Sequence, residues 1–174
     1  MPIEKLTTKR VEKPWGRRDL NAGFPNPVGS EGPVGEIWFQ SSQVSDPELL
    51  IKYLFTSEKL SVQNHPSDME AGRRGLPRGK DECWIILEAE PDSTIALGPI
   101  GSMTRDELRA SALDGTLEGR LDWKPVKSGD FFFSKSGVVH AIGAGITLIE
   151  VQQNSDTTYR LFDYGRPREL HLDD

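Results

Sequence analysis

The segment LSVQNHPSD, residues 60–68, has the pattern of a short strand that carries polar side chains on one face. Its leucine and valine are expected core residues, and its proline ends the strand. Because side chains alternate across a strand, Gln63 and His65 share one face while Asn64 points to the other. An amide and an imidazole side by side on a barrel-like strand suggest a functional site rather than ordinary surface residues.

The rest of the chain is also dominated by short strands that are separated by Gly, Pro, Asn and Asp. Closely spaced strands with turn signals between them favour an all-β barrel or sandwich over parallel βαβ units. We predict a single domain, residues 1–174, with surface loops at 21–35 and 69–80. The predicted strands span residues 34–40, 49–55, 60–65, 83–89, 93–98, 129–134, 138–142, 145–152 and 157–164.

One segment has helical rather than strand character. In TRDELRASALDGTLEGRL, residues 104–121, Thr104 and Glu107 have the spacing of a capping box. Gly115 follows the apolar stripe at a position typical of a helix C-terminus. We therefore predict a short α-helical insertion at about 104–120 between two halves of the β-fold.

Composition excludes several classes of partner. The chain has 174 residues, a formal charge of −6 and no basic block, which argues against nucleic acid. No apolar run approaches the ~20 residues that span a bilayer, so we expect no membrane partner. The first ten residues lack the apolar region of a secretory signal. Cys83 is the single cysteine, is expected to be buried, and fits a reducing, cytoplasmic location.

The three histidines allow a metal site. His171 lies in a polar terminal stretch, whereas His65 and His140 lie in predicted strands. Together with Glu82 and Gln63, these two imidazoles form a suitable ligand set for Zn²⁺, one ion per chain. Taken alone, the residues fit hydrogen-bonded core histidines about as well as they fit a metal site.

Six motifs occur in a fixed order from Lys13 to about Leu172, which is nearly the whole chain. They resemble the type I mannose-6-phosphate isomerases, especially their compact bacterial branch. The resemblance implies a cupin fold, which is a double-stranded β-helix or jelly-roll barrel with a metal in its mouth. The motifs are KPWG, GEIW, LSVQNHPSD, GKDECWIIL, SGVVHAIGAG and EVQQNSDTTYRLFDYGRPRELHL.

The resemblance implies a zinc-dependent aldose–ketose isomerase that interconverts mannose 6-phosphate and fructose 6-phosphate through a cis-enediol. It implies that Gln63, His65, Glu82 and His140 bind the zinc. The opening segment would then supply two ligands from one strand face.

The resemblance also points to three catalytic residues. Arg160 would stabilise the developing enediolate charge, while Lys80 and Asp156 would move protons. Each has a plainer interpretation: a surface charge cluster for Lys80, an ordinary turn for Asp156 and a barrel rim for Arg160. The substrate phosphate is expected to meet a basic rim. The residues available there are Lys135, Arg73 and Arg166.

Two departures from the family pattern leave alternatives open. The text KPWGRR replaces the usual KPWGG, and family members generally continue past RELHL into a further β-rich region. A sheet edge exposed there would favour a homodimer. The alternative functions are a non-catalytic cupin that binds a metal or a sugar phosphate, and an iron-dependent cupin oxygenase.

Overall fold

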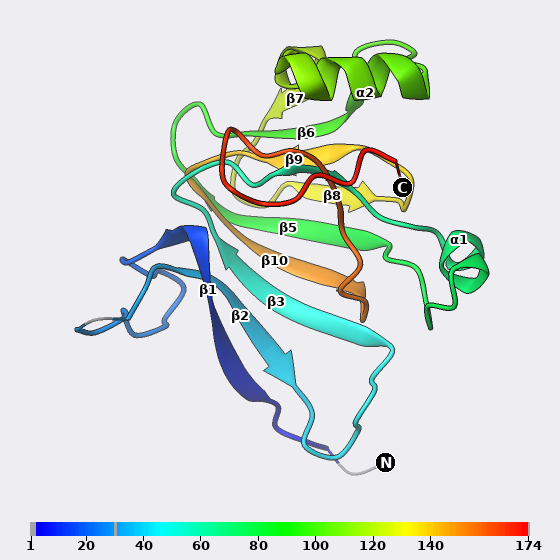
Figure 1. Ribbon diagram of the computed structural model, residues 1–174. Helices are drawn as coiled ribbons and strands as arrows, with labels where there is room; N and C mark the ends of the chain where they lie inside the picture. The colour runs from blue at the N-terminus through cyan, green and yellow to red at the C-terminus, as the bar shows by residue number, and fades with distance from the viewer. Residues whose placement is uncertain (1–2, 30, 174) are drawn as a thin grey trace.

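Two antiparallel sheets form the fold in the computed structural model, which describes residues 3–29 and 31–173 (Figure 1). The six-stranded sheet has the order β1 (Thr7–Arg17), β2 (Val34–Gln40), β3 (Leu49–Phe55), β10 (Ile146–Gln153), β5 (Glu82–Ala89) and β8 (Phe131–Ser134). The five-stranded sheet has the order β11 (Tyr159–Phe162), β4 (Val62–Asn64), β9 (His140–Ile142), β6 (Thr94–Pro99) and β7 (Leu121–Pro125).

The main hydrophobic core lies between the two sheets. Trp84 and Leu148 of the six-stranded sheet share one buried cluster with Ile95 and Ile142 of the five-stranded sheet. These four side chains are at most 1% exposed, so this part of the space between the sheets is closed to water. Because strand side chains alternate, the opposite side of each strand faces outward. The prediction of an all-β fold is confirmed.

The predicted helical insertion is also confirmed. Helix α2 (Arg105–Asp114) begins after Thr104, whose hydroxyl and backbone N–H are engaged reciprocally by Glu107. It ends at Gly115, whose φ of 80° is a left-handed conformation that favours glycine. A 3-10 helix, η1 (Leu117–Arg120), completes the insertion. Within residues 3–29 and 31–173, no helix is long and apolar enough to cross a membrane.

Some expectations were wrong in detail. The stretch 69–80 is not entirely a loop, because helix α1 (Asp68–Arg73) occupies its start. The cause is a second capping box, between Ser67 and Glu70, with Ala71 buried beneath the helix. Cys83 is half-exposed rather than buried, since it points away from the core. Strands β1 and β7 were not predicted.

Candidate metal centre and its cavity

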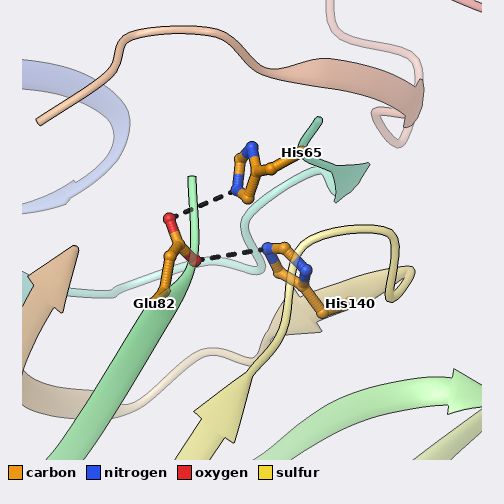
Figure 2. Close-up of side chains that lie close together, drawn as sticks. All are labelled: His65, Glu82 and His140. Carbon is orange, nitrogen blue, oxygen red and sulfur yellow. Dashed lines mark ion pairs between the residues drawn. The ribbon is translucent and has the colours of Figure 1, made fainter. Parts of the chain in front are cut away.

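Three strands from the two sheets bring the candidate metal ligands together. His65 follows β4, Glu82 begins β5 and His140 begins β9. Each offers one ligand atom, and these atoms lie within 4.8 Å of one another. His65 Nε2 is 3.2 Å from Glu82 Oε1, and His140 Nε2 is 3.6 Å from Glu82 Oε2. Figure 2 shows the two imidazoles facing the carboxylate, and all three side chains are buried.

The backbone fixes the orientation of both imidazoles. His65 Nδ1 lies 3.0 Å from the carbonyl oxygen of Thr157, and His140 Nδ1 lies 2.9 Å from that of Val138. A carbonyl can only accept a hydrogen bond, so each ring carries a proton on Nδ1. The Nε2 atoms face Glu82 and are the ones available to a metal, as in metal-binding imidazoles whose other nitrogen is held by a carbonyl.

The Glu82 carboxylate is ionised and short of hydrogen bonds. Burial would raise the pKa of Glu82, but its neighbours, with the charge of Lys80 foremost, outweigh burial and hold it well below its usual range. Lys80 Nζ forms an ion pair with Oε1 at 2.7 Å. Even so, neither buried oxygen accepts a hydrogen bond from the described residues. Such an orphaned carboxylate calls for an additional partner.

His140 is neutral at ordinary pH. Burial lowers the pKa of His140 to about 4, although the neighbouring Glu82 carboxylate opposes that shift. An ionised carboxylate and a neutral imidazole are the protonation states that a divalent metal requires of such ligands. The residues present therefore fit a divalent cation such as zinc.

Gln63 adjoins this cluster but presents its nitrogen to it. Gln63 and His140 are register partners across β4 and β9, and their Nε2 atoms are 3.3 Å apart. The amide oxygen of Gln63 instead accepts a hydrogen bond from Ser61 Oγ at 3.1 Å. An amide ligates metals through oxygen, so Gln63 would have to rotate its amide to bind. Its role as a fourth ligand stays a prediction.

A cavity of about 330 Å³ lies beside the cluster and brings together the three predicted catalytic residues. Lys80, Asp156 and Arg160 line it together with Gln63. Residues from the KPWG and GEIW motifs also contribute to its wall. They are Lys13, Trp15, Glu36 and Trp38.

More cations than carboxylates line the cavity. Five cationic side chains and three carboxylates line it, while Lys80 and Arg168 pair with Glu82 and Asp163, which lie outside the lining, so these charges balance. Among the described residues, Arg160 is the lining cation without an ion pair, so it is the cation most available to an anionic ligand. The cations are Lys13, Lys52, Lys80, Arg160 and Arg168, and the carboxylates are Glu36, Glu150 and Asp156.

A buried charge network in the cavity wall was missed by sequence reasoning. Lys52 Nζ lies 3.2 Å from Glu150 Oε2 and 3.8 Å from Glu36 Oε2. Lys13 Nζ lies 3.3 Å from Glu36 Oε1, and the Trp84 indole donates to Glu150 Oε1 at 3.1 Å. One signal was available: Lys52 and Glu150 are single charges within apolar strands, at inward positions.

This network sets the charge state of its members. Burial would lower the pKa of Lys52, but Glu150 and Glu36 outweigh burial and raise it. Burial would raise the pKa of Glu36, but Lys52 and Lys13 outweigh burial and lower it. The ion pairs therefore stay charged inside the fold.

Arg160 is oriented at the cavity by one hydrogen bond, and part of its guanidinium has no hydrogen-bond partner among the described residues. Its Nη1 donates to the carbonyl of Glu169 at 3.0 Å, while its buried Nε has no hydrogen-bond partner among the described residues. Burial, followed by the charge of Arg168, lowers the pKa of Arg160 from its ordinary value. Arg168 itself donates two hydrogen bonds of 2.6 Å to Asp163.

The residues suggested for the phosphate do not line this cavity. Arg166 pairs with Glu58 and Asp163, and neither Arg73 nor Lys135 is among the lining residues. The lining cations outside the predicted set are Lys13, Lys52 and Arg168.

Comparison with known proteins relates this chain to mannose-6-phosphate isomerases. A scan against protein-family models finds no match. Mannose-6-phosphate isomerase ManA of Bacillus subtilis is 46% identical over 131 residues, which cover 71% of this chain and 41% of that protein. The probable mannose-6-phosphate isomerase GmuF of the same organism is 40% identical over 175 residues, which cover 97% of this chain and 50% of that protein.

The comparison with solved structures points to the same group of enzymes. The crystal structure of a Bacillus subtilis mannose 6-phosphate isomerase matches with a TM-score of 0.85 at 31% identity, over 96% of this chain and 65% of that one. Fold and site thus define a two-sheet β-protein with a buried candidate metal centre beside a polar cavity. By sequence and by fold, the chain is a relative of the type I mannose-6-phosphate isomerases. It spans about half the length of the first curated relatives that it matches.

Proposed function

We propose that this chain carries the active site of a zinc-dependent aldose–ketose isomerase acting on mannose 6-phosphate and fructose 6-phosphate. The observation that carries the proposal is the junction of a buried His–Glu–His cluster with a cavity lined by Lys80, Asp156 and Arg160. One zinc would be held by His65, Glu82 and His140, with Gln63 as a fourth ligand after its amide rotates. The relatives that bear this activity by name support the substrate assignment.

The reaction makes definite demands on the residues. The sugar ring opens, and a proton then moves between C1 and C2 through a cis-enediol. Bound zinc would supply Lewis-acid polarisation of a substrate oxygen. The remaining tasks are proton transfer, stabilisation of the enediolate charge, and recognition of the phosphate.

Arg160 is assigned to the enediolate charge. A guanidinium keeps its proton under all ordinary conditions, so it offers a fixed cation in a partly desolvated site. Its unpartnered Nε–H is a donor that is available to a substrate oxygen. Its Nη1 is held by the Glu169 carbonyl, so the group is already oriented before substrate binds.

Lys80 and Asp156 are assigned to proton transfer. Lys80 lies at the boundary between cluster and cavity, with its Nζ 2.7 Å from Glu82 Oε1 and 3.4 Å from His65 Nε2. It is buried and yet lines the cavity, so it can meet a sugar in a space with little water. Asp156 is exposed and lines the same cavity, which suits a role in ring opening. Both roles require hydrogen-bond reach to the substrate.

The cations that line the cavity support a phosphate-bearing substrate. Lys13 lines the cavity, and its side chain is 31% exposed in its pair with Glu36. Its ammonium group therefore has further donors that can meet a phosphate oxygen. A cytoplasmic location, compatible with a single cysteine, remains part of the proposal.

A coupled assay with mannose 6-phosphate tests the proposal. Purified protein is assayed as isolated, after chelation, and after zinc is restored, with bound metal measured each time. We expect turnover that is lost on chelation and recovered with zinc. Lys124→Ala, at an exposed lysine paired with Asp122, is the matched control and should behave as the parent protein. Stoichiometric zinc without any turnover would overturn the isomerase assignment in favour of a binding protein.

A further inference from the structure

Four separate segments of the chain supply most of the residues assigned to the candidate metal centre and its cavity. One segment follows β4, one leads into β5, one leads into β9 and one follows β10. Because they lie far apart in sequence, their relative positions depend on contacts between the segments. The site residues that they carry are His65, Lys80, Glu82, His140 and Asp156.

Gln153, the last residue of β10, hydrogen bonds to two of the other segments through its side chain. Its Oε1 accepts a hydrogen bond from the backbone N–H of Asp81 at 2.8 Å, and its Nε2 donates to Asp68 Oδ1 at 3.1 Å. Its backbone N–H also donates to the carbonyl of Asp81 at 3.0 Å. Both sides of this amide are therefore in use, and they tie the end of β10 to two site segments.

Asp81 extends these contacts to the loop before β9. Its Oδ1 accepts a hydrogen bond from the backbone N–H of Ser136 at 2.8 Å. In the same loop, Gly137 donates its N–H to the carbonyl of His65 at 2.9 Å. Because Asp81 directly precedes Glu82, the loop before β9 is joined to the segments of two candidate ligands.

Asp68 connects the segment after β4 to the segment that leads into β5. Its Oδ1 accepts a hydrogen bond from the backbone N–H of Gly79 at 2.8 Å, besides the one from Gln153. Nearby, the backbone N–H of Lys80 donates to the carbonyl of Pro66 at 3.0 Å. The two segments are so close that a Cβ on Gly79 would lie 2.5 Å from the backbone nitrogen of Asp68. Glycine permits this approach without a shift of the backbone.

We call this set of contacts the clasp, and its residues are Asp68, Gly79, Asp81, Ser136 and Gln153. None of the five lines the cavity, and none belongs to the His–Glu–His cluster. They therefore act on the site only through the segments that they join. Zinc holds nitrogen and oxygen ligands at about 2.0–2.2 Å, so its affinity depends on how those segments are spaced.

We propose that Asp81 and Gln153 are positioning residues, which together with Asp68 hold the ligands of the candidate metal centre at the spacing that zinc requires. The inference rests on the metal centre of the proposed function and assigns a role in it to residues outside the site. The hydrogen bonds from Gln153 to Asp81 and from Asp81 to Ser136 are partly buried, so water competes with them less than at the surface. An ordinary structural contact would stabilise the fold without changing zinc affinity.

Zinc affinity of Gln153→Ala tests the clasp against a matched neighbour. Competition with a chromophoric chelator should show an affinity lowered by at least about 10-fold, because the segments lose a shared partner. Asn154→Ala is the control, since the Asn154 side chain donates one hydrogen bond of 3.0 Å to the Pro47 carbonyl, in a loop without assigned site residues. Urea unfolding should show similar losses of stability in the two variants, while Asn154→Ala keeps the zinc affinity of the parent protein.

Substitution of Asp81 adds a test by rescue. Asp81→Ala removes the acceptor of the Ser136 N–H and should lower zinc affinity by at least about 10-fold. Asp81→Asn keeps an oxygen acceptor without the charge and should restore most of that affinity. If the charge of Asp81 mattered rather than its hydrogen bond, the asparagine variant would behave as the alanine variant does.

Gly79→Ala tests the spacing of the segments directly. Its added methyl group would force the backbone away from Asp68, so zinc should bind less tightly. Cobalt(II) bound in place of zinc should then show an altered visible absorption, which reports on the geometry of its ligands. Gly72→Ala, on α1, is the matched control, because a Cβ there meets nothing within 4 Å. It should leave both zinc affinity and the cobalt spectrum unchanged.

The affinity comparisons decide the role of the clasp. A Gln153→Ala protein that binds zinc as tightly as Asn154→Ala, or an Asp81→Asn protein no better than Asp81→Ala, would overturn the proposal. Failure of the isomerase assignment looks different, because it is zinc binding without turnover and leaves these comparisons intact. A parent protein that binds no zinc would overturn the clasp together with the metal centre.

Discussion

Gln63 of β4 and His140 of β9 are register partners, and the Gln63 amide nitrogen lies 3.3 Å from His140 Nε2. Because His140 Nδ1 is tied to the Val138 carbonyl, His140 Nε2 is the acceptor of this hydrogen bond. The lone pair that a metal requires is therefore occupied by an amide N–H. Metal binding must displace Gln63 or rotate its amide so that oxygen replaces nitrogen.

This relationship predicts unequal effects of two substitutions on zinc affinity. His140→Ala should abolish stoichiometric zinc, because it removes a buried ligand from a three-residue cluster. Gln63→Ala should lower the affinity for zinc by only about 10–100-fold, since the two imidazoles and the carboxylate remain. Competition with a chromophoric chelator measures both affinities. Equal losses of zinc affinity in the two variants would show that Gln63 is as necessary a ligand as His140.

Arg160 should separate metal binding from turnover. Arg160→Ala is expected to keep zinc and lose at least about 100-fold in kcat, because a cation that meets developing charge is removed. Arg160→Lys should recover little, since a lysine does not reproduce the guanidinium geometry. Steady-state kinetics with measured zinc content checks both variants. The control is Arg109→Ala, which is exposed and pairs with Asp173. A near-normal kcat in Arg160→Ala would remove Arg160 from this role.

Local patterns predicted most of the fold. The bounds of β2 and β3 agree with the predicted 34–40 and 49–55, because each is an apolar run between turn residues. Thr104 and Glu107 located the start of α2 for a similar local reason. Strand β1, TTKRVEKPWGR, was missed because it is an edge strand rich in charged residues. Its place is fixed by pairing with β2, which lies outside any local window.

The site was predictable to the extent that motifs named its residues. His65, Glu82 and His140 were singled out by type and predicted strand face, and the fold brings them together. The orientation of Gln63 was not predictable, because it depends on Ser61 and on cross-strand register with His140. The Lys52 network was missed for a related reason: its members lie far apart in the chain and meet only in the folded protein.

Substitutions at Lys52 and at Glu150 should have strongly coupled effects on the free energy of unfolding. Lys52→Met leaves two buried carboxylates without their shared cation and should lower the free energy of unfolding by about 3–5 kcal/mol. Adding Glu150→Gln removes one of these charges while keeping an acceptor for the Trp84 indole. The double variant should therefore be more stable than the sum of the single effects predicts, by at least about 1 kcal/mol. Urea unfolding of the four proteins measures this coupling, and strict additivity would contradict it.

Glu36 should give the stability of the protein a defined dependence on pH. Burial opposes ionisation of Glu36, but Lys52 and Lys13 prevail and hold its pKa below the ordinary 4.5. A carboxyl group whose pKa is depressed by folding stabilises the native state above its unfolded pKa. That contribution is lost as pH falls through the lower, native value. Glu36→Gln removes the titrating group and should lower the free energy of unfolding at pH 7 by about 2 kcal/mol.

The difference in free energy of unfolding between the parent protein and Glu36→Gln should therefore be constant from pH 7 to about pH 5. It should shrink at pH values below the ordinary pKa of 4.5. Urea unfolding at several pH values between 7 and 3.5 measures it. Glu58→Gln is the matched control, because Glu58 is 61% exposed in its pair with Arg166. Exposed pairs of this kind contribute about 0–1 kcal/mol, so this variant should show little change at any pH. A Glu36→Gln difference that persists unchanged at pH 3.5 would mean that the lost stability comes from packing rather than from charge.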